Sequence, residues 1–181
     1  MFDLDEFVAD CRVALAETDR AGAVRELLER AGRERASIVA ALGQPGRGRL
    51  EALHHAPDLT VLNVVWTPGM VLAPHDHDML AAIAVYGGRE DNDFYRRRGS
   101  MVEAAGGRTV EEGDVLLMGE DPVHGVRSHP GRYTGGIHVY AGDFFNRDRK
   151  MWDAETGNEI AEPPPVAELF EEAERRWQAR S

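Results

Sequence analysis

The stretch that decides the fold is Trp66-Thr67-Pro68-Gly69-Met70-Val71-Leu72-Ala73-Pro74-His75-Asp76-His77, which ends on two histidines separated by one residue. Side chains alternate between the faces of a β-strand, so His75 and His77 point the same way in an extended chain. Both imidazoles then reach one metal ion, whereas a helix would need histidines four residues apart. The flanking segments 61–65 and 81–85 are mostly apolar and favour strands. The pair indicates two metal ligands on the inner face of a sheet; two solvated histidines beside a loop are the alternative.

Short strand-like segments separated by turns rich in Gly and Pro extend from residue 50 to about 143. Many short strands at regular spacing indicate a sandwich or a barrel. We expect Gly106-Gly107 to bound one of these strands rather than to lie inside it. The expected strands cover 59–66, 70–73, 80–86, 94–97, 101–104, the surroundings of Thr109 and Val110, 115–118 and 133–140.

Helices are expected before and after this region. Residues 3 to about 42 begin with an Asp3–Glu6 capping box and carry apolar residues at spacings of three and four, with an interruption at Gly22. After residue 143, Pro163-Pro164-Pro165 forms a stiff spacer before a final amphipathic helix. We expect these helices to pack on the outside of the β region; a dimerisation arm is the alternative for the first ones.

Composition restricts the class of protein. The chain has 181 residues, of which 43% are hydrophobic, and this length suits one domain with a sizeable core. A formal net charge of −11 disfavours nucleic acid and anionic membranes as partners. The single cysteine, Cys11, excludes an intrachain disulfide and a cysteine-based metal site. The acidic segment 1–6 is unlike a signal peptide, so we expect a cytoplasmic protein, a monomer or a homodimer.

A second block supplies a third histidine. Gly113-Asp114 leads into the apolar segment 115–118, and Pro122-Val123-His124 follows on the return. In a small antiparallel barrel, His124 can face inward toward His75 and His77. Three imidazoles leave open positions on an ion for water, substrate or dioxygen. Such a site suits Fe(II), and also Zn, Ni, Mn or Cu.

These motifs together resemble those of the cupin superfamily. The resemblance implies a mainly β fold, the cupin double-stranded β-helix (RmlC-like jelly-roll barrel), with N-terminal helices and a C-terminal helix. It implies a single cupin domain over 1–181, with a helical segment at 1–45, the barrel at 50–145 and an extension with a helix at 146–181.

Within the superfamily, the chain resembles the thiol dioxygenase branch, which includes cysteine dioxygenase and 3-mercaptopropionate dioxygenase. Cupins usually add a Glu ligand shortly after the histidine pair, and here Ala81 and Ala82 occupy that place. Trp66 precedes His75 at the spacing of this branch. Gly136-Ile137-His138-Val139-Tyr140 is similar to its Ser-x-His-x-Tyr motif.

The resemblance implies a mononuclear non-heme iron dioxygenase that oxidises a small thiol with dioxygen to its sulfinate. Its iron ligands would be His75, His77 and His124. Two catalytic roles are implied: Tyr140 places its hydroxyl near substrate or oxygen, and His138 hydrogen-bonds that hydroxyl. A neighbour that orients a group in the site in this way also tunes its chemistry.

Three departures from the branch are visible. Gly136 replaces the Ser of the motif, which shortens the relay. Ala82 stands where animal cysteine dioxygenases carry a Cys that crosslinks to the Tyr. The branch holds the substrate carboxylate with an Arg; the matching position here is His55, with Arg49 as a substitute under another alignment of the turn. Because His lacks the bidentate fork of Arg, the substrate need not be cysteine.

Two other functions remain open from the sequence. A three-histidine zinc centre activates water for hydrolysis or lyase chemistry. Cupin barrels also serve as non-catalytic small-molecule-binding modules, since fold alone does not determine function.

Overall fold

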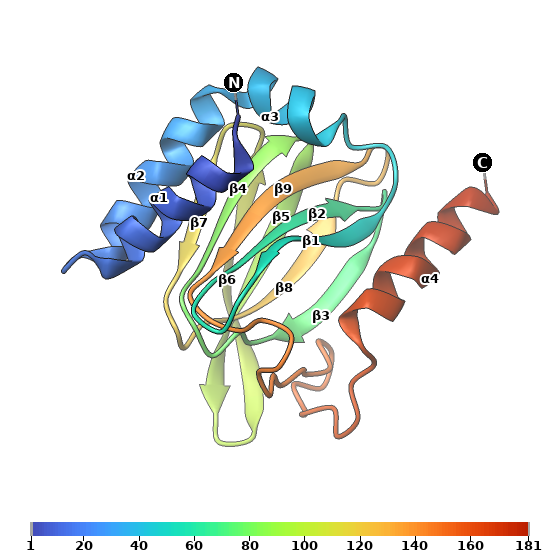
Figure 1. Ribbon diagram of the computed structural model, residues 1–181. Coiled ribbons are helices and arrows are strands. Elements are labelled where there is room, and N and C mark those ends of the chain that lie inside the picture. Colours follow the sequence, from blue (N-terminus) through green and yellow to red (C-terminus); the bar gives the residue numbers. More distant parts are fainter. Residues whose placement is uncertain (1, 181) are drawn as a thin grey trace.

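Two antiparallel sheets face each other in the structure, a computed structural model that describes residues 2–180 (Figure 1). One sheet has five strands in the order β1-β2-β9-β4-β7, and the other has four in the order β3-β8-β5-β6. The first consists of β1 (Arg49–His55), β2 (Thr60–Trp66), β9 (Thr134–Tyr140), β4 (Ala81–Gly87) and β7 (Val115–Met118). The second consists of β3 (Val71–His75), β8 (Val123–Ser128), β5 (Arg89–Arg98) and β6 (Met101–Glu111).

The pairing of strands far apart in the sequence defines the topology. Strand β9 lies between β2 and β4, and β8 lies between β3 and β5, all antiparallel. Each sheet is thus built from both halves of the β region, as in a jelly roll. This arrangement confirms the expected fold class, a double-stranded β-helix with N-terminal helices and a C-terminal helix.

The two faces of the five-stranded sheet bury different groups. Strand β9 shows the alternation: His138 and Tyr140 point between the sheets, whereas Ile137 and Val139 point to the other face. On that other face, apolar side chains pack against the three N-terminal helices (Figure 1). These helices are α1 (Leu4–Ala16), α2 (Arg20–Arg33) and α3 (Arg35–Leu42). The helices cover the outside of the barrel, and the polar groups of interest lie inside it.

The expected helix break at Gly22 is wrong, because Gly22 lies inside α2 and the two helices are separated at residues 17–19. Asp19 is the N-cap of α2, and its carboxylate accepts a hydrogen bond from the backbone N–H of Gly22 (3.0 Å). A Cβ at Gly22 would collide with that carboxylate. Glycine at this position therefore makes room for the cap instead of ending a helix.

The expected strand boundary at Gly106-Gly107 is also wrong, because β6 runs through both residues. The register of the β5–β6 hairpin shifts here: Phe94 pairs with Gly106 and Tyr95 with Ala104. One extra residue is thus accommodated as a β-bulge, and Gly106 takes a φ of 130°. The glycine supplies the backbone conformation of the bulge without ending the strand.

The C-terminal helix α4 (Val166–Gln178) packs back on the barrel, as expected. Phe170 lies against Trp66 with ring centroids 4.9 Å apart. The buried Glu174 carboxylate accepts hydrogen bonds from the Thr67 hydroxyl (2.9 Å) and the Gly48 backbone N–H (2.7 Å). Between β9 and α4 runs a segment, residues 143–165, that we call the strap; it passes beside β3 (Figure 1).

Among the helices described here, none combines the length and the apolar character that crossing a membrane requires.

Candidate metal centre

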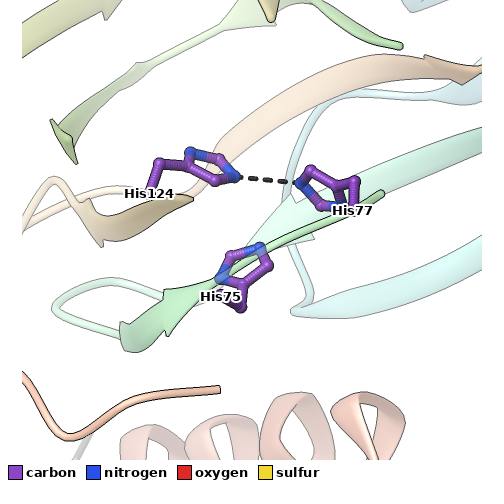
Figure 2. Close-up of side chains that lie close together, drawn as sticks. All are labelled: His75, His77 and His124. Atoms are coloured by element: carbon purple, nitrogen blue, oxygen red, sulfur yellow. Dashed lines mark hydrogen bonds between the residues drawn. The ribbon is translucent and has the colours of Figure 1, made fainter. Parts of the chain in front are cut away.

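Two paired strands bring the three histidines together. His75 is the last residue of β3, His77 follows two residues later, and His124 lies near the start of β8, where it is the register partner of His75. Figure 2 shows the three rings converging. All three are buried, and one ring nitrogen from each lies within 4.8 Å of the others. The sequence-predicted ligands therefore form one cluster inside the barrel.

Hydrogen bonds on the far side of two rings determine which nitrogen can bind an ion. Nδ1 of His75 donates to the backbone carbonyl of Ala73 (2.9 Å), and Nδ1 of His124 donates to Oδ1 of Asn92 (2.8 Å). In a neutral imidazole, a protonated Nδ1 leaves a lone pair on Nε2. Both rings are thus held as ligands with Nε2 available.

The spacing of the nitrogens fits a shared metal ion. Nε2 of His77 and Nε2 of His124 lie 3.0 Å apart (Figure 2). Two nitrogens that each bind one ion at about 2.1 Å, at right angles, are separated by about 3 Å. Nδ1 of His77 is buried without a hydrogen-bond partner among residues 2–180. Three neutral nitrogen donors suit Fe(II), Zn(II) and the neighbouring divalent metals, and they leave further positions on the ion open.

Burial keeps these rings neutral. It lowers the pKa of His75 to about 4, and it lowers the pKa of His77 and of His124 well below the usual value. The proximity of the other imidazoles lowers the latter two pKa values further. At pH 7 the lone pairs are therefore available to a cation without competition from protons.

The residues expected to act on substrate stand beside the cluster. The Tyr140 hydroxyl and Nδ1 of His138 are hydrogen-bonded at 3.1 Å, and the Tyr140 ring lies 5.0 Å from the His77 ring. Burial raises the pKa of Tyr140, so its hydroxyl keeps its proton at neutral pH. Burial also lowers the pKa of His138 to about 3. The pair consists of two neutral groups that share one hydrogen bond.

The departure at Gly136 has a structural consequence for this pair. A Cβ at Gly136 would lie 3.2 Å from Nε2 of His138. That nitrogen is buried and has no hydrogen-bond partner in the described part of the chain. The relay therefore ends at His138, as the replacement of Ser by Gly implies.

A cavity of about 230 Å³ opens in front of the histidines. Its volume suits a small molecule rather than a polymer. The barrel contributes His75, His77, His124, His138, Tyr140, Trp66, Leu50, Val64, Leu72, Asp76 and Val126, and the strap and α4 contribute Phe144, 147–151, 163–165, Val166 and Phe170.

The two residues expected to hold a substrate carboxylate, His55 and Arg49, lie elsewhere. Nε2 of His55 is 2.7 Å from the Asp143 carboxylate. Arg49 donates to the carboxylate of Glu51 (3.0 Å) and to the backbone carbonyl of Leu42. The cavity lining drawn from the described residues includes neither His55 nor Arg49. The structure does not bring them to the histidine cluster.

A different cation, Arg149 of the strap, lines the cavity. Its guanidinium carbon lies 3.9 Å from the centroid of the Phe144 ring. Nε of Arg149 is buried, and within residues 2–180 it has no hydrogen-bond partner. Burial lowers the pKa of Arg149, but a guanidinium in a protein stays protonated. The charged segment 146–150 was the only sequence signal, and it does not reveal which side chain turns inward.

Asp76 and Asp78, which neighbour the metal ligands in the sequence, anchor the strap. The Asp76 carboxylate accepts from Arg97 (2.6 Å) and from the backbone N–H of Lys150 (2.8 Å). Arg147 pairs with Asp78 (3.2 Å). The loop that carries His75 and His77 thus also fixes the segment on either side of Arg149.

Comparisons with known proteins find only distant similarities to solved structures. No protein-family model matches the chain, and no curated protein matches it. A solved RmlC-like cupin family protein with a double-stranded β-helix fold from Methanocaldococcus jannaschii is 11% identical, with a TM-score of 0.46 over 55% of this chain and 85% of that one. A Bacillus halodurans protein is 18% identical, with a TM-score of 0.48 over 62% and 77%. A Klebsiella pneumoniae protein with a double-stranded β-helix domain is 18% identical, with a TM-score of 0.44 over 61% and 90%.

The strand order and the buried histidine cluster define the class independently of these scores. The chain is a double-stranded β-helix with a candidate metal centre between its sheets.

Proposed function

We propose that the protein is a mononuclear non-heme iron dioxygenase that oxidises a small thiol with an anionic group, similar to cysteine or 3-mercaptopropionate, to its sulfinate. The observation that supports it is one cavity lined by three neutral histidines, the Tyr140 hydroxyl and the Arg149 guanidinium, whose buried Nε has no hydrogen-bond partner in residues 2–180. No carboxylate joins the histidines as a ligand in the described chain.

The overall reaction is balanced without a further reductant. A thiol and dioxygen give a sulfinic acid: both oxygen atoms bond to sulfur, sulfur loses four electrons and dioxygen gains them. Bound Fe(II) supplies the redox chemistry that lets dioxygen react with a thiolate. Three neutral donors leave the ion its full positive charge, which favours the thiolate form of the substrate.

The side chains of the cavity position the substrate and the protons. Arg149 faces the cavity with an unpaired N–H, so it binds the anionic group of the substrate by a charge-assisted hydrogen bond. Tyr140 keeps its proton and donates it in a hydrogen bond to an anion beside His77. His138 fixes the direction of the Tyr140 hydroxyl. Apolar walls that include Leu72 exclude water.

The same donor set supports a second candidate, a zinc hydrolase or lyase. Three histidines and an open position are the ligands of catalytic zinc, which lowers the pKa of its bound water to about 7. The two proposals differ in the metal retained and in the consumption of dioxygen. A non-catalytic binding module would show neither thiol oxidation nor zinc-dependent hydrolase or lyase activity.

The test is aerobic turnover by iron-reconstituted protein of a panel containing 3-mercaptopropionate, cysteine and cysteamine, which lacks the carboxylate. We expect one dioxygen consumed per sulfinate formed with an anionic thiol. His124→Ala should lose both iron and activity, whereas the control His129→Ala, on the turn after β8, should keep both. Zinc-loaded protein that consumes no dioxygen with any thiol, even after iron reconstitution, would favour the second candidate. A His124→Ala protein with full iron content and full activity would refute the ligand assignment.

A further inference from the structure

Strand β5 places two polar side chains inside the barrel beside the metal centre. Glu90 and Asn92 are completely buried, two residues apart on one face of the strand. Strand β5 pairs with β8, with Phe94 opposite His124 and Asn92 opposite Val126. A buried carboxylate is costly unless its oxygens are hydrogen-bonded, so its position inside the core requires a reason.

A chain of hydrogen bonds connects this carboxylate to a metal ligand. Nδ2 of Asn92 donates to Oε1 of Glu90 (3.0 Å), and Oδ1 of Asn92 accepts from Nδ1 of His124 (2.8 Å). The carboxylate thus determines which way the amide faces. The amide oxygen in turn requires the proton of His124 to be on Nδ1, which leaves Nε2 for the ion.

We propose that Glu90 and Asn92 are positioning residues for the metal ligand His124. The other two ligands differ: Nδ1 of His75 donates to a backbone carbonyl, and Nδ1 of His77 has no partner in residues 2–180. His124 is therefore the ligand whose orientation depends on side chains that can be changed by mutation. The inference rests on the proposed metal binding and is independent of thiol oxidation.

The matched control is a second buried asparagine, Asn63 on β2. Its Nδ2 donates to Glu51 (3.0 Å) and its Oδ1 accepts from the Tyr86 hydroxyl (2.8 Å), and it does not line the cavity as described. Asn63→Leu removes a buried amide that is hydrogen-bonded to none of the three histidines. It separates a general loss of packing from a specific effect on His124.

The experiment measures Co(II) and Zn(II) affinity of the full chain by competition with a chromophoric chelator, together with the Co(II) absorption spectrum. We expect Asn92→Leu to weaken metal binding about 10- to 100-fold and to shift the spectrum. Glu90→Met, which removes the acceptor for Nδ2 of Asn92, should weaken binding less, since the amide of Asn92 remains. Asn63→Leu should keep wild-type affinity and spectrum.

Wild-type affinity and spectrum in folded Asn92→Leu would overturn the proposal. Should that variant not fold, Glu90→Met decides instead, because it keeps the length of the side chain but removes the acceptor for Asn92; unchanged affinity and spectrum there would also overturn the proposal. A wild-type protein that binds metal but oxidises no thiol refutes the proposed function alone. Metal binding that is indifferent to Asn92 and Glu90 refutes this inference alone.

Discussion

The cavity has two walls of opposite character, the barrel and the strap. The barrel contributes neutral, buried histidines held by strands and hydrogen bonds. The strap contributes Arg149 and is held to the barrel by charged groups, through Asp76 and Asp78. The contrast teaches that metal binding and recognition of an anion are separable here: the first belongs to the sheets and the second to a connecting segment.

Each wall has a physical reason to be where it is. A metal site needs donors fixed to within a fraction of an ångström, and paired strands provide that precision. A guanidinium needs water or an anion, so it lies in the segment that borders the opening of the barrel. Mutations in the two walls should consequently affect different measurements.

The barrel wall should make the metal-free protein sensitive to acid. Burial lowers the pKa of His75 to about 4 and of His138 to about 3, and lowers the pKa of His77 and His124 as well. Below pH 6.5 the unfolded chain then binds more protons than the folded one, so stability present above pH 6.5 is lost as the pH falls. Each ring contributes at most about 1.4 kcal/mol per pH unit.

One buried group of the barrel acts in the opposite direction. Burial raises the pKa of Glu90 to about 7, so between pH 4.5 and 7 the folded state binds its proton first and stability falls as the pH rises. Four rings outweigh one carboxyl, and we expect a net loss of several kcal/mol between pH 7 and 5 in urea denaturation with chelator present. His138→Gln should reduce the slope, and His129→Gln should not. A free energy of unfolding that does not change between pH 7 and 5 would contradict the burial of neutral histidines in the barrel.

Removing the strap's cation should impair substrate binding while metal binding stays intact. Arg149→Met keeps a side chain on the Phe144 ring but loses a hydrogen bond to a charged group, worth about 1.5–3 kcal/mol. The KM for 3-mercaptopropionate should rise about 10- to 100-fold in oxygen uptake, at unchanged iron content. The KM for cysteamine serves as the control and should change little. An equal loss for both thiols would show that Arg149 does not read the anionic group.

Weakening the anchor of the strap should also raise KM at unchanged iron content, but by less than the loss of Arg149. Asp76→Asn loses the ion pair with Arg97 but keeps an acceptor for the Lys150 backbone N–H. Because this pair is half-buried, we expect a loss of about 1 kcal/mol in stability and a rise of about two- to fivefold in KM. Faster hydrogen exchange should be confined to 147–151. Arg97→Gln breaks the same ion pair from the other side and should reproduce the result; loss of iron in both variants would mean that the walls are not separable.

A surface pair that does not line the cavity should have the smallest effect. Arg98 and Glu103 form an exposed ion pair on the β5–β6 hairpin (3.1 Å). Exposed pairs contribute about 0–1 kcal/mol. Arg98→Ala should therefore leave the denaturation midpoint, iron content and KM nearly unchanged. A large change in KM would extend the substrate-binding surface to this hairpin.

The sequence predicted the barrel wall better than the strap. The spacing of His75 and His77 and the block that ends at His124 point to a cluster, because alternation along a strand fixes the face of a side chain. Alternation likewise puts His138 and Tyr140 on one face. The strap has no repeating geometry, so no sequence pattern shows that Arg149 turns into the cavity. The sequence instead placed His55 or Arg49 at the substrate, and neither residue lines the cavity drawn from the described residues.

By itself, therefore, the sequence predicted a sandwich or barrel and the three histidines from local periodicity and spacing, and the resemblance of its motifs implied the jelly roll. Only the tertiary structure decided that Arg149 enters the cavity, and that Glu90 and Asn92 lie behind His124. These facts depend on which strands pair, in which register, and on how a segment without regular structure crosses them. Such contacts join residues tens of positions apart, and no local pattern encodes them.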